Sequence, residues 1–270
     1  MRHPAKLAVA LSLLALVFLT GCNKLRARDE LNKGVRAYKA GQFETAIGHF
    51  QRSIELDPKL LNARLYLATA YASQFVPGAP TEENKQMGEA ALRGFEKVLE
   101  VDPNNITALS YIASLYYGMG QGEKSLEGIR TWFDKSKQFR RRLIQVDSQN
   151  PEHDYSIGVL DWALAYRANE ELRRELRLRP DEPFAARDRR ALAEKNAAVV
   201  EEGIEMLQKA IELNPKYVDA IAYMNLIYRQ KADIVDTPDE RERYLDLADE
   251  MFDRQKRLRE EMQATAPATH

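Results

Sequence analysis

Residues 53–58 read SIELDP, and two close copies follow as VLEVDP at 98–103 and AIELNP at 210–215. Each copy ends in proline, which cannot continue a helix because it lacks the backbone N–H and clashes with the preceding turn. We therefore expect one helix to end at each copy. Self-similarity of this kind predicts an array of repeated helical units.

A segment rich in Ala and Tyr follows each copy and is expected to form the next helix. A fourth, weaker copy, IQVDS at 144–148, is followed by a similar segment. The four segments are ARLYLATAY at 63–71, ALSYIASLYY at 108–117, YSIGVLDWALAY at 155–166 and AIAYMNLIYR at 220–229. Strand-like alternation of useful length is missing from the sequence, so we expect an all-α fold.

These features resemble the tetratricopeptide repeat (TPR), a helix–turn–helix unit of about 34 residues. In the first unit, small Gly34 and Ala46 allow close helix approach, and Gly41 ends the first helix. The remaining family positions are Tyr38, Phe50 and Pro58, then Ala68, Tyr71, Ala91, Phe95 and Pro103, then Ala113, Tyr116 and Gly120, and lastly Tyr228, Ala248 and Phe252. The resemblance implies a helix–turn–helix solenoid of about five repeats with insertions over residues 22–262. The alternative is a generic helical bundle.

The copies are spaced more widely than in the family. The interval from Pro58 to Pro103 exceeds the family unit of about 34 residues, and the interval from Ser148 to Pro215 is nearly twice that unit. These repeats therefore carry insertions. We expect a loop at 75–82, a longer second helix through 131–145, helix extensions around a turn within 168–195, and an insertion at 234–243 that includes a helix start at 237–238.

Residues 1–21 have the pattern of a secretory signal peptide. Arg2 and Lys6 are followed by an apolar run from Leu7 to Phe18 that only Ser12 interrupts. The run is shorter than the roughly 20 apolar residues that span a bilayer, so it predicts a signal rather than a membrane helix.

The run ends in Leu19-Thr20-Gly21-Cys22, which resembles the lipobox of bacterial lipoproteins. The resemblance implies that Cys22 receives acyl chains such as palmitate and that the chain is cut before it. Cys22 is the only cysteine, so no disulfide is expected. An ordinary signal peptide with a chance cysteine is the alternative. In that family an aspartate after the cysteine retains many lipoproteins in the inner membrane, so the resemblance, with Asn23 at this position, implies the periplasmic face of the outer membrane.

Charge and motifs argue for neither nucleic-acid binding nor catalysis. The net charge is −1 with 30% charged residues, and the arginine runs alternate with acidic residues, as on solvated helix faces. His49 and His153 have no cysteine or histidine partner at ligand spacing. The usual phosphate-loop, nucleophile-elbow and zinc-protease motifs are missing from the sequence. We expect no enzyme activity, no cofactor and no metal.

In the family, the first helices of successive repeats line a concave groove that binds peptides or helices. The family's chaperone-binding carboxylate clamp is not expected, because Leu31 and Val35 occupy its Lys and Asn positions. Packing between repeats is the alternative role for Tyr117 and Trp162. The resemblance places in the groove Tyr38, Asn62, Leu65, Tyr117, Tyr155, Trp162 and Arg229.

The combination predicts a membrane-anchored scaffold or adaptor of the bacterial cell envelope that recruits a protein partner through its groove, with an envelope assembly complex as a candidate partner. A self-associating structural envelope protein is one alternative, and an accessory subunit of an envelope enzyme complex is another. Residues 263–270 are expected to form a flexible tail.

Overall fold

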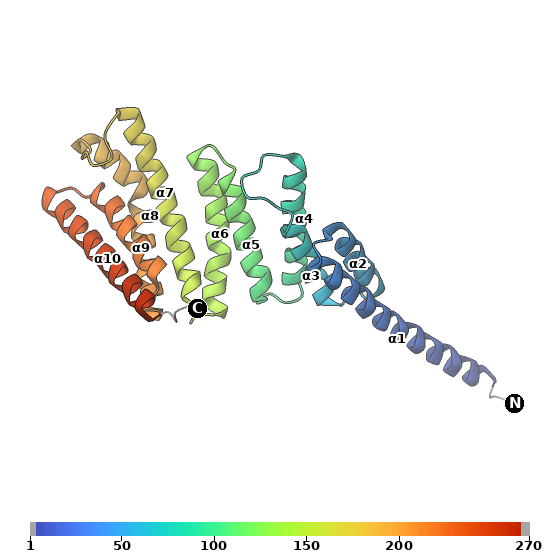
Figure 1. Cartoon of the computed structure of the whole chain (residues 1–270). Coiled ribbons are helices and arrows are strands. Elements are labelled where there is room, and N and C mark those ends of the chain that lie inside the picture. The colour runs from blue at the N-terminus through green and yellow to red at the C-terminus, as the bar shows by residue number, and fades with distance from the viewer. Residues whose placement is uncertain (1–3, 266–270) are drawn as a thin grey trace. The chain divides into compact units, whose positions relative to one another are not determined.

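The computed structural model describes the backbone of residues 4–265 and the side chains of residues 22–264. Within that range the chain forms ten α-helices and no strand (Figure 1), which confirms the all-α prediction. The helices follow one another as five helix–turn–helix pairs. They are α1 (Pro4–Lys39), α2 (Phe43–Leu56), α3 (Leu61–Ala72), α4 (Glu82–Leu99), α5 (Ile106–Gln121), α6 (Leu126–Val146), α7 (Pro151–Leu176), α8 (Ala186–Leu213), α9 (Val218–Ala232) and α10 (Pro238–Thr265).

The helices group into two compact units, the first ending at Gly122 and the second beginning at Glu123. Helices α1 to α5 form the first unit and α6 to α10 the second, so the division falls between the two helices of the third pair. Each unit has a hydrophobic core of its own. The side chains of the predicted signal peptide, residues 1–21, lie outside the described residues.

Local sequence signals explain where the helices begin and end. Gly41 follows the end of α1 with a φ of 73°, in the left-handed region that glycine adopts without strain. The repeat prolines lie two to four positions beyond the last residues of α2, α4 and α8, as predicted. Five helices begin after a side chain that accepts a hydrogen bond from the first turn, namely Thr81, Asn105, Ser125, Asn150 and Thr237.

Close approach of neighbouring helices organises the first unit. A Cβ placed on Gly34 of α1 would lie 2.5 Å from the ring of Phe50 on α2, so the absence of a side chain there makes room for that ring. Phe50 in turn stacks on Tyr66 of α3, with 5.6 Å between ring centroids. The next repeat has the same pair at the same interval along the chain, because Phe95 stacks on Tyr111 at 4.8 Å. A ring on each of these second helices thus packs on a tyrosine of the following first helix.

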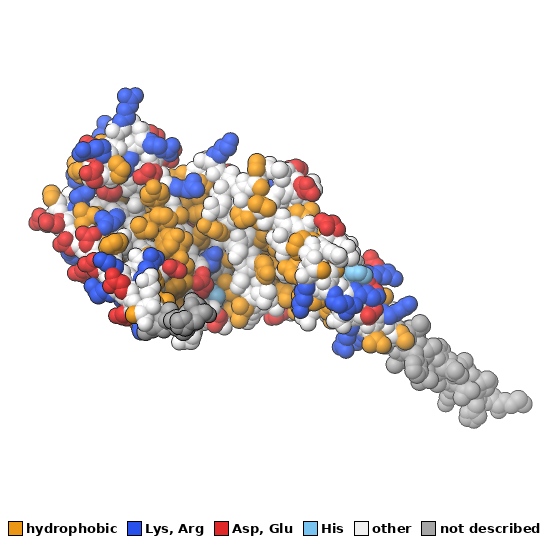
Figure 2. Space-filling model, viewed as in Figure 1, with side chains coloured by type: hydrophobic (Ala, Val, Ile, Leu, Met, Phe, Trp, Pro, Cys, Tyr) orange, Lys and Arg blue, Asp and Glu red, His pale blue; other side chains and the backbone are white. Residues whose placement is uncertain are grey.

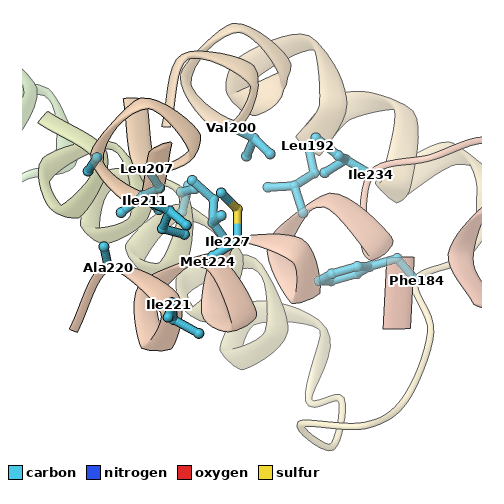
Figure 3. Close-up of a cluster of buried hydrophobic side chains, with 13 residues drawn as sticks. Phe184, Leu192, Val200, Leu207, Ile211, Ala220, Ile221, Met224, Ile227 and Ile234 are labelled. Atoms are coloured by element: carbon cyan, nitrogen blue, oxygen red, sulfur yellow. The ribbon is translucent and has the colours of Figure 1, made fainter. Parts of the chain in front are cut away.

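The second unit has a larger core between α7, α8 and α9, shown in Figure 3. Leu207 of α8 is fully buried and takes the position of the phenylalanines, at the same interval before Tyr223. Gly158 of α7 allows the contact, since a Cβ there would lie 2.5 Å from Cγ of Leu207. Other core members are Val200, Ile211, Ile221, Met224 and Ile227.

The predicted loop after α3 is confirmed and is internally ordered. Asn84 of α4 accepts a hydrogen bond from the backbone N–H of Val76 and donates to the carbonyls of Val76 and Ala79. Phe75 fills the space beside Gly88 and Gly118, where an added Cβ would lie 3.0 and 2.7 Å from its ring. The longer α6, the turn between α7 and α8, and the start of α10 at Pro238 also agree with the predictions.

Phe252 does not occupy the buried position that the family resemblance assigned to it. It is 55% exposed, whereas Phe50 and Phe95 are fully buried. Those rings are covered by a tyrosine from the next first helix, and α10 is the last helix of the described chain. Helix α10 continues to Thr265, and residues 266–270 of the expected tail lie outside the described residues.

A buried ion cluster joins α6, α7 and α8. Lys137 Nζ lies 2.7 Å from Asp161 Oδ1 and 3.1 Å from Glu202 Oε2, and Arg141 also pairs with Glu202. Asp161 is fully buried and Lys137 nearly so. Burial raises the pKa of Asp161 to about 7, although the charge of Lys137 acts in the opposite direction. Protonation of Asp161 is therefore favoured by folding.

Gly34→Val should destabilise the first unit by about 1–3 kcal/mol, because the added side chain overlaps the fully buried ring of Phe50. Gly48→Ala is the matched control: Gly48 lies in α2 with open space around its Cβ position, and alanine is the better helix former. Urea unfolding followed by far-ultraviolet circular dichroism compares the two. Equal effects of both substitutions would contradict the packing described here.

Lys137→Met should destabilise the second unit by about 3–5 kcal/mol at pH 8, because it leaves the carboxylate of Asp161 buried without its cation. The loss should be smaller at pH 5. The folded-state pKa of Asp161 lies above the ordinary value of an aspartate, so its contribution to stability is present at low pH and is lost as pH rises towards 7. Removing Lys137 raises that pKa further.

Urea unfolding monitored by tryptophan fluorescence measures this effect, because both tryptophans, Trp132 and Trp162, lie in the second unit. Lys124→Met, at an exposed position, is the control and should change stability little at either pH. An equal loss for Lys137→Met at pH 5 and pH 8 would show that Asp161 does not titrate in this way.

Candidate functional site

A line of aromatic side chains runs along one side of α7. Tyr155, Trp162 and Tyr166 are separated by seven and four positions. At about 100° per residue these spacings place all three within roughly 20° of one direction. The extended, uninterrupted α7 therefore presents its rings as one stripe.

Rings from the next repeat extend this stripe into a surface. Tyr223 of α9 packs edge-on against Tyr155 and Trp162, with centroid distances of 5.7 and 5.1 Å. Tyr217, just before α9, lies 4.9 Å from Tyr155, and Trp162 stacks on Tyr166 at 5.3 Å. We call these five residues the aromatic face. Hydrophobic side chains gather over α7 and α9 on the side of the molecule shown in Figure 2.

The aromatic face is part core and part surface. Tyr166 is 41% exposed and Leu226, nearby on α9, is 36% exposed. Tyr155, Trp162 and Tyr223 are half-buried. Trp162 packs against a ring of the next repeat, as the alternative interpretation has it, and it also remains partly exposed.

A polar contact fixes one end of the aromatic face. The hydroxyl of Tyr217 donates a hydrogen bond to the carboxylate of Glu152, in the first turn of α7. Burial, and then the hydrogen bond to Glu152, raises the pKa of Tyr217. The hydroxyl therefore remains protonated and donates at neutral pH. The Tyr217 ring is positioned both by this hydrogen bond and by its contact with the ring of Tyr155.

The other predicted groove residues are distributed differently. Tyr38 lies on α1, and its hydroxyl forms a 2.7 Å hydrogen bond with Ser73, the residue that follows α3. Asn62 is exposed and Leu65 half-buried on α3, and Tyr117 is half-buried on α5. These four belong to the first helices of the first unit, where α3 contacts both α1 and α5. They are therefore not members of the aromatic face.

Arg229 lies on α9 but points elsewhere. Its guanidinium pairs with Asp249 of α10 at 2.6 Å. Six positions separate it from Tyr223, which at about 100° per residue turns it roughly 120° around the helix. The structure thus brings together Tyr155 and Trp162, and leaves Arg229 at the contact between α9 and α10.

Sequence reasoning missed three of the five residues, namely Tyr166, Tyr217 and Tyr223. A signal for Tyr223 was present, because it follows Pro215 at the same interval as Tyr66 follows Pro58 and Tyr111 follows Pro103. Tyr217 and Tyr166 could not be found from the repeat pattern, since their role depends on how α7 and α9 lie beside each other.

The histidines form local pairs with carboxylates. His49 lies 2.7 Å from Glu30, and His153 lies 3.0 Å from Asp147. Among the residues whose side chains are described, no group of three or more potential ligands could hold a metal ion. Cys22 is exposed on α1. In the same described part of the chain, no helix combines the length and apolar character needed to cross a membrane.

Within each unit, first helices of neighbouring repeats contact one another, and in the second unit aromatic rings lie between them. No family model matches the sequence, and no curated protein matches it. Solved structures do match. A crystal structure of MamA protein aligns with a TM-score of 0.57 at 13% identity and covers 91% of this chain and 98% of that chain.

Two further solved structures are similar. MamA 41-end from Desulfovibrio magneticus RS-1 aligns with a TM-score of 0.56 at 16% identity, over 87% of this chain and 96% of that chain. TTC0263, a thermophilic TPR protein in Thermus thermophilus, aligns with a TM-score of 0.42 at 18% identity, over 74% and 98%. At such identities the likeness bears on the fold alone, which is an all-α TPR solenoid.

Proposed function

We propose that this protein is a lipid-anchored scaffold of the bacterial cell envelope that recruits a protein partner through its aromatic face. The observation that carries the proposal is the set of five contiguous rings, of which Tyr166 remains substantially exposed. Partly buried tyrosine and tryptophan are the residues that most often supply binding energy in protein interfaces, because they bury large areas at low cost in side-chain entropy.

The shape of this surface favours an elongated partner. The stripe on α7 runs from Tyr155 to Tyr166, which at about 1.5 Å per residue is roughly 16 Å of helix. An amphipathic helix or an extended apolar segment presents side chains over such a length. The fold and the local histidine pairs support binding rather than catalysis.

The anchor is proposed from the sequence around Cys22. The lone cysteine follows an apolar run and small residues, and it is exposed at the start of the described side chains. Several acyl chains on one residue give stable membrane attachment, because each buried methylene contributes about 0.8 kcal/mol. We propose the periplasmic face of the outer membrane as the site of attachment, on the basis of Asn23.

A second candidate is a structural protein that associates with itself. The observation that favours it is Phe252, which is 55% exposed at the position where other repeats are covered by a neighbour. A second copy covering α10 would bury this ring.

Photocrosslinking in the native host distinguishes the two candidates. Benzoylphenylalanine in place of Tyr166 should give one dominant adduct with a different protein, because this position is the most exposed member of the aromatic face. The same residue in place of Phe252, which is also exposed but lies on α10, should not give that adduct. Adducts between identical copies, from Phe252 alone or from both positions, would instead support self-association.

Cys22→Ala should release the protein from the membrane fraction, because it removes the only thiol that could carry lipid. Fractionation of cells, with mass spectrometry of the N-terminal peptide, measures both attachment and acylation. Asn23→Asp is the matched control: it should keep the acyl chains and change the membrane in which the protein is found. Retention of Cys22→Ala in the membrane would refute the lipid anchor.

A further inference from the structure

The two segments inserted into the last repeats lie against each other and border a cavity. On one side are Phe184 and Arg189, from the turn after α7 and the first turn of α8. On the other are Val235, Arg241 and Leu245, from the connection after α9 and the start of α10. The cavity has a volume of about 590 Å³, within the range of small-molecule sites. We call it the insertion pocket.

A buried arginine holds the walls of the insertion pocket in position. Arg173 donates hydrogen bonds to the carbonyls of Arg179 and Glu182 in the turn, at 2.8 and 2.7 Å. The same guanidinium pairs with Asp233, the residue that follows α9, at 2.7 Å. It also lies over the ring of Phe184, 4.4 Å from the centroid. The two inserted segments are thus fixed to α7 and to each other before any ligand binds.

Phe184 belongs to the hydrophobic core of the second unit and also borders the insertion pocket. Figure 3 shows its ring at one side of the cluster that also contains Leu207, Met224 and Ile227. Phe184 is 4% exposed, so the ring packs firmly while contributing to the lining of the pocket. The pocket therefore has a rigid apolar wall.

Two arginines give the insertion pocket an excess of positive charge. Neither Arg189 nor Arg241 has a carboxylate within ion-pair distance among residues 22–264. Arg189 is oriented by a 2.8 Å hydrogen bond to the carbonyl of Asp236. Nε of each arginine is enclosed and has no hydrogen-bond partner in that range, so neither guanidinium has its donors filled. Glu242 also lines the pocket, which leaves a net charge of one positive unit.

We propose that the insertion pocket binds a carboxylate carried on an apolar group. The planar donor fork of arginine matches a carboxylate, and Phe184, Val235 and Leu245 provide an apolar surface for the attached group. The one excess positive charge of the pocket balances a ligand with a single negative charge. A phosphate dianion would keep one uncompensated negative charge near the carboxylate of Glu242. Two sources supply this chemistry, the end of a peptide chain and a free organic acid.

This site is separate from the aromatic face. The insertion pocket is lined by residues 183–189 and 235–245, whereas the aromatic face comes from α7, α9 and the residue just before α9, and the two share no residue. The proposal therefore does not depend on the proposed function. A variant could lose binding at the insertion pocket and keep the aromatic face intact, and another could lose the aromatic face and keep the pocket.

The test measures binding to the full chain by calorimetry, with four probes. These are 3-phenylpropionate, its uncharged counterpart 3-phenylpropanol, acetyl-Ala-Leu-Leu with a free carboxylate, and the same peptide as its amide. At least one acid should bind about ten-fold more tightly than its uncharged counterpart, the usual scale for a hydrogen bond to a charged group. Whichever acid binds identifies the source. Binding of neither acid, or equal binding of acid and counterpart, overturns the proposal.

Variants connect that binding to the pocket. Arg241→Met should weaken the acid about ten-fold, whereas Arg190→Met, at an exposed position next to Arg189, should leave its affinity unchanged. Glu242→Gln should strengthen binding, because it removes the competing negative charge, and this variant keeps the arginines that shape the site. Circular dichroism confirms that each variant is folded. Unchanged affinity in both Arg241→Met and Glu242→Gln shows that the acid binds elsewhere and overturns the assignment.

Discussion

A ring or a branched side chain on one helix, packed on a tyrosine of the next repeat, holds successive repeats together within each unit. Phe50 meets Tyr66 in this way, and Phe95 meets Tyr111. The ring of Phe50 can take this position only because α1 and α2 lie very close together, and Gly34, which has no side chain, permits that approach. Because the same interval between the two partners recurs, each of these repeats sets the position of its successor, and the first helices come to lie side by side.

This arrangement explains where a binding surface can form. First helices that touch bring side chains from separate repeats into one layer, and α7, α9 and the residue just before α9 contribute five rings to it. Tyr166 is the most exposed ring on α7. It stacks on Trp162, and Trp162 in turn contacts Tyr223. The rings that pack neighbouring repeats together are therefore also the rings of the proposed binding surface, and Trp162 is half-buried because it packs against Tyr223.

Most of the fold could be predicted from the repeat pattern in the sequence. Prolines and glycines mark helix ends through local backbone chemistry, so the five helix pairs and the places of the insertions could be predicted from the sequence. Contacts between distant segments could not. The sequence alone did not indicate that Arg173 would join two insertions, or that Phe252 would remain exposed. Of the candidate surface, Tyr155 and Trp162 were predicted, while Tyr217 depended on tertiary packing.

The contacts of Arg173 with the turn after α7 and with Asp233 also limit how this chain can change over evolutionary time. Shortening the turn at 177–185 removes the carbonyls that satisfy the guanidinium, and losing Arg173 leaves Asp233 and Asn169 facing each other without a cation. Either change alone leaves a buried charge without one of its partners, which lowers stability. The turn, the arginine and the aspartate are therefore expected to be inherited as a block, and related chains should carry all three or none.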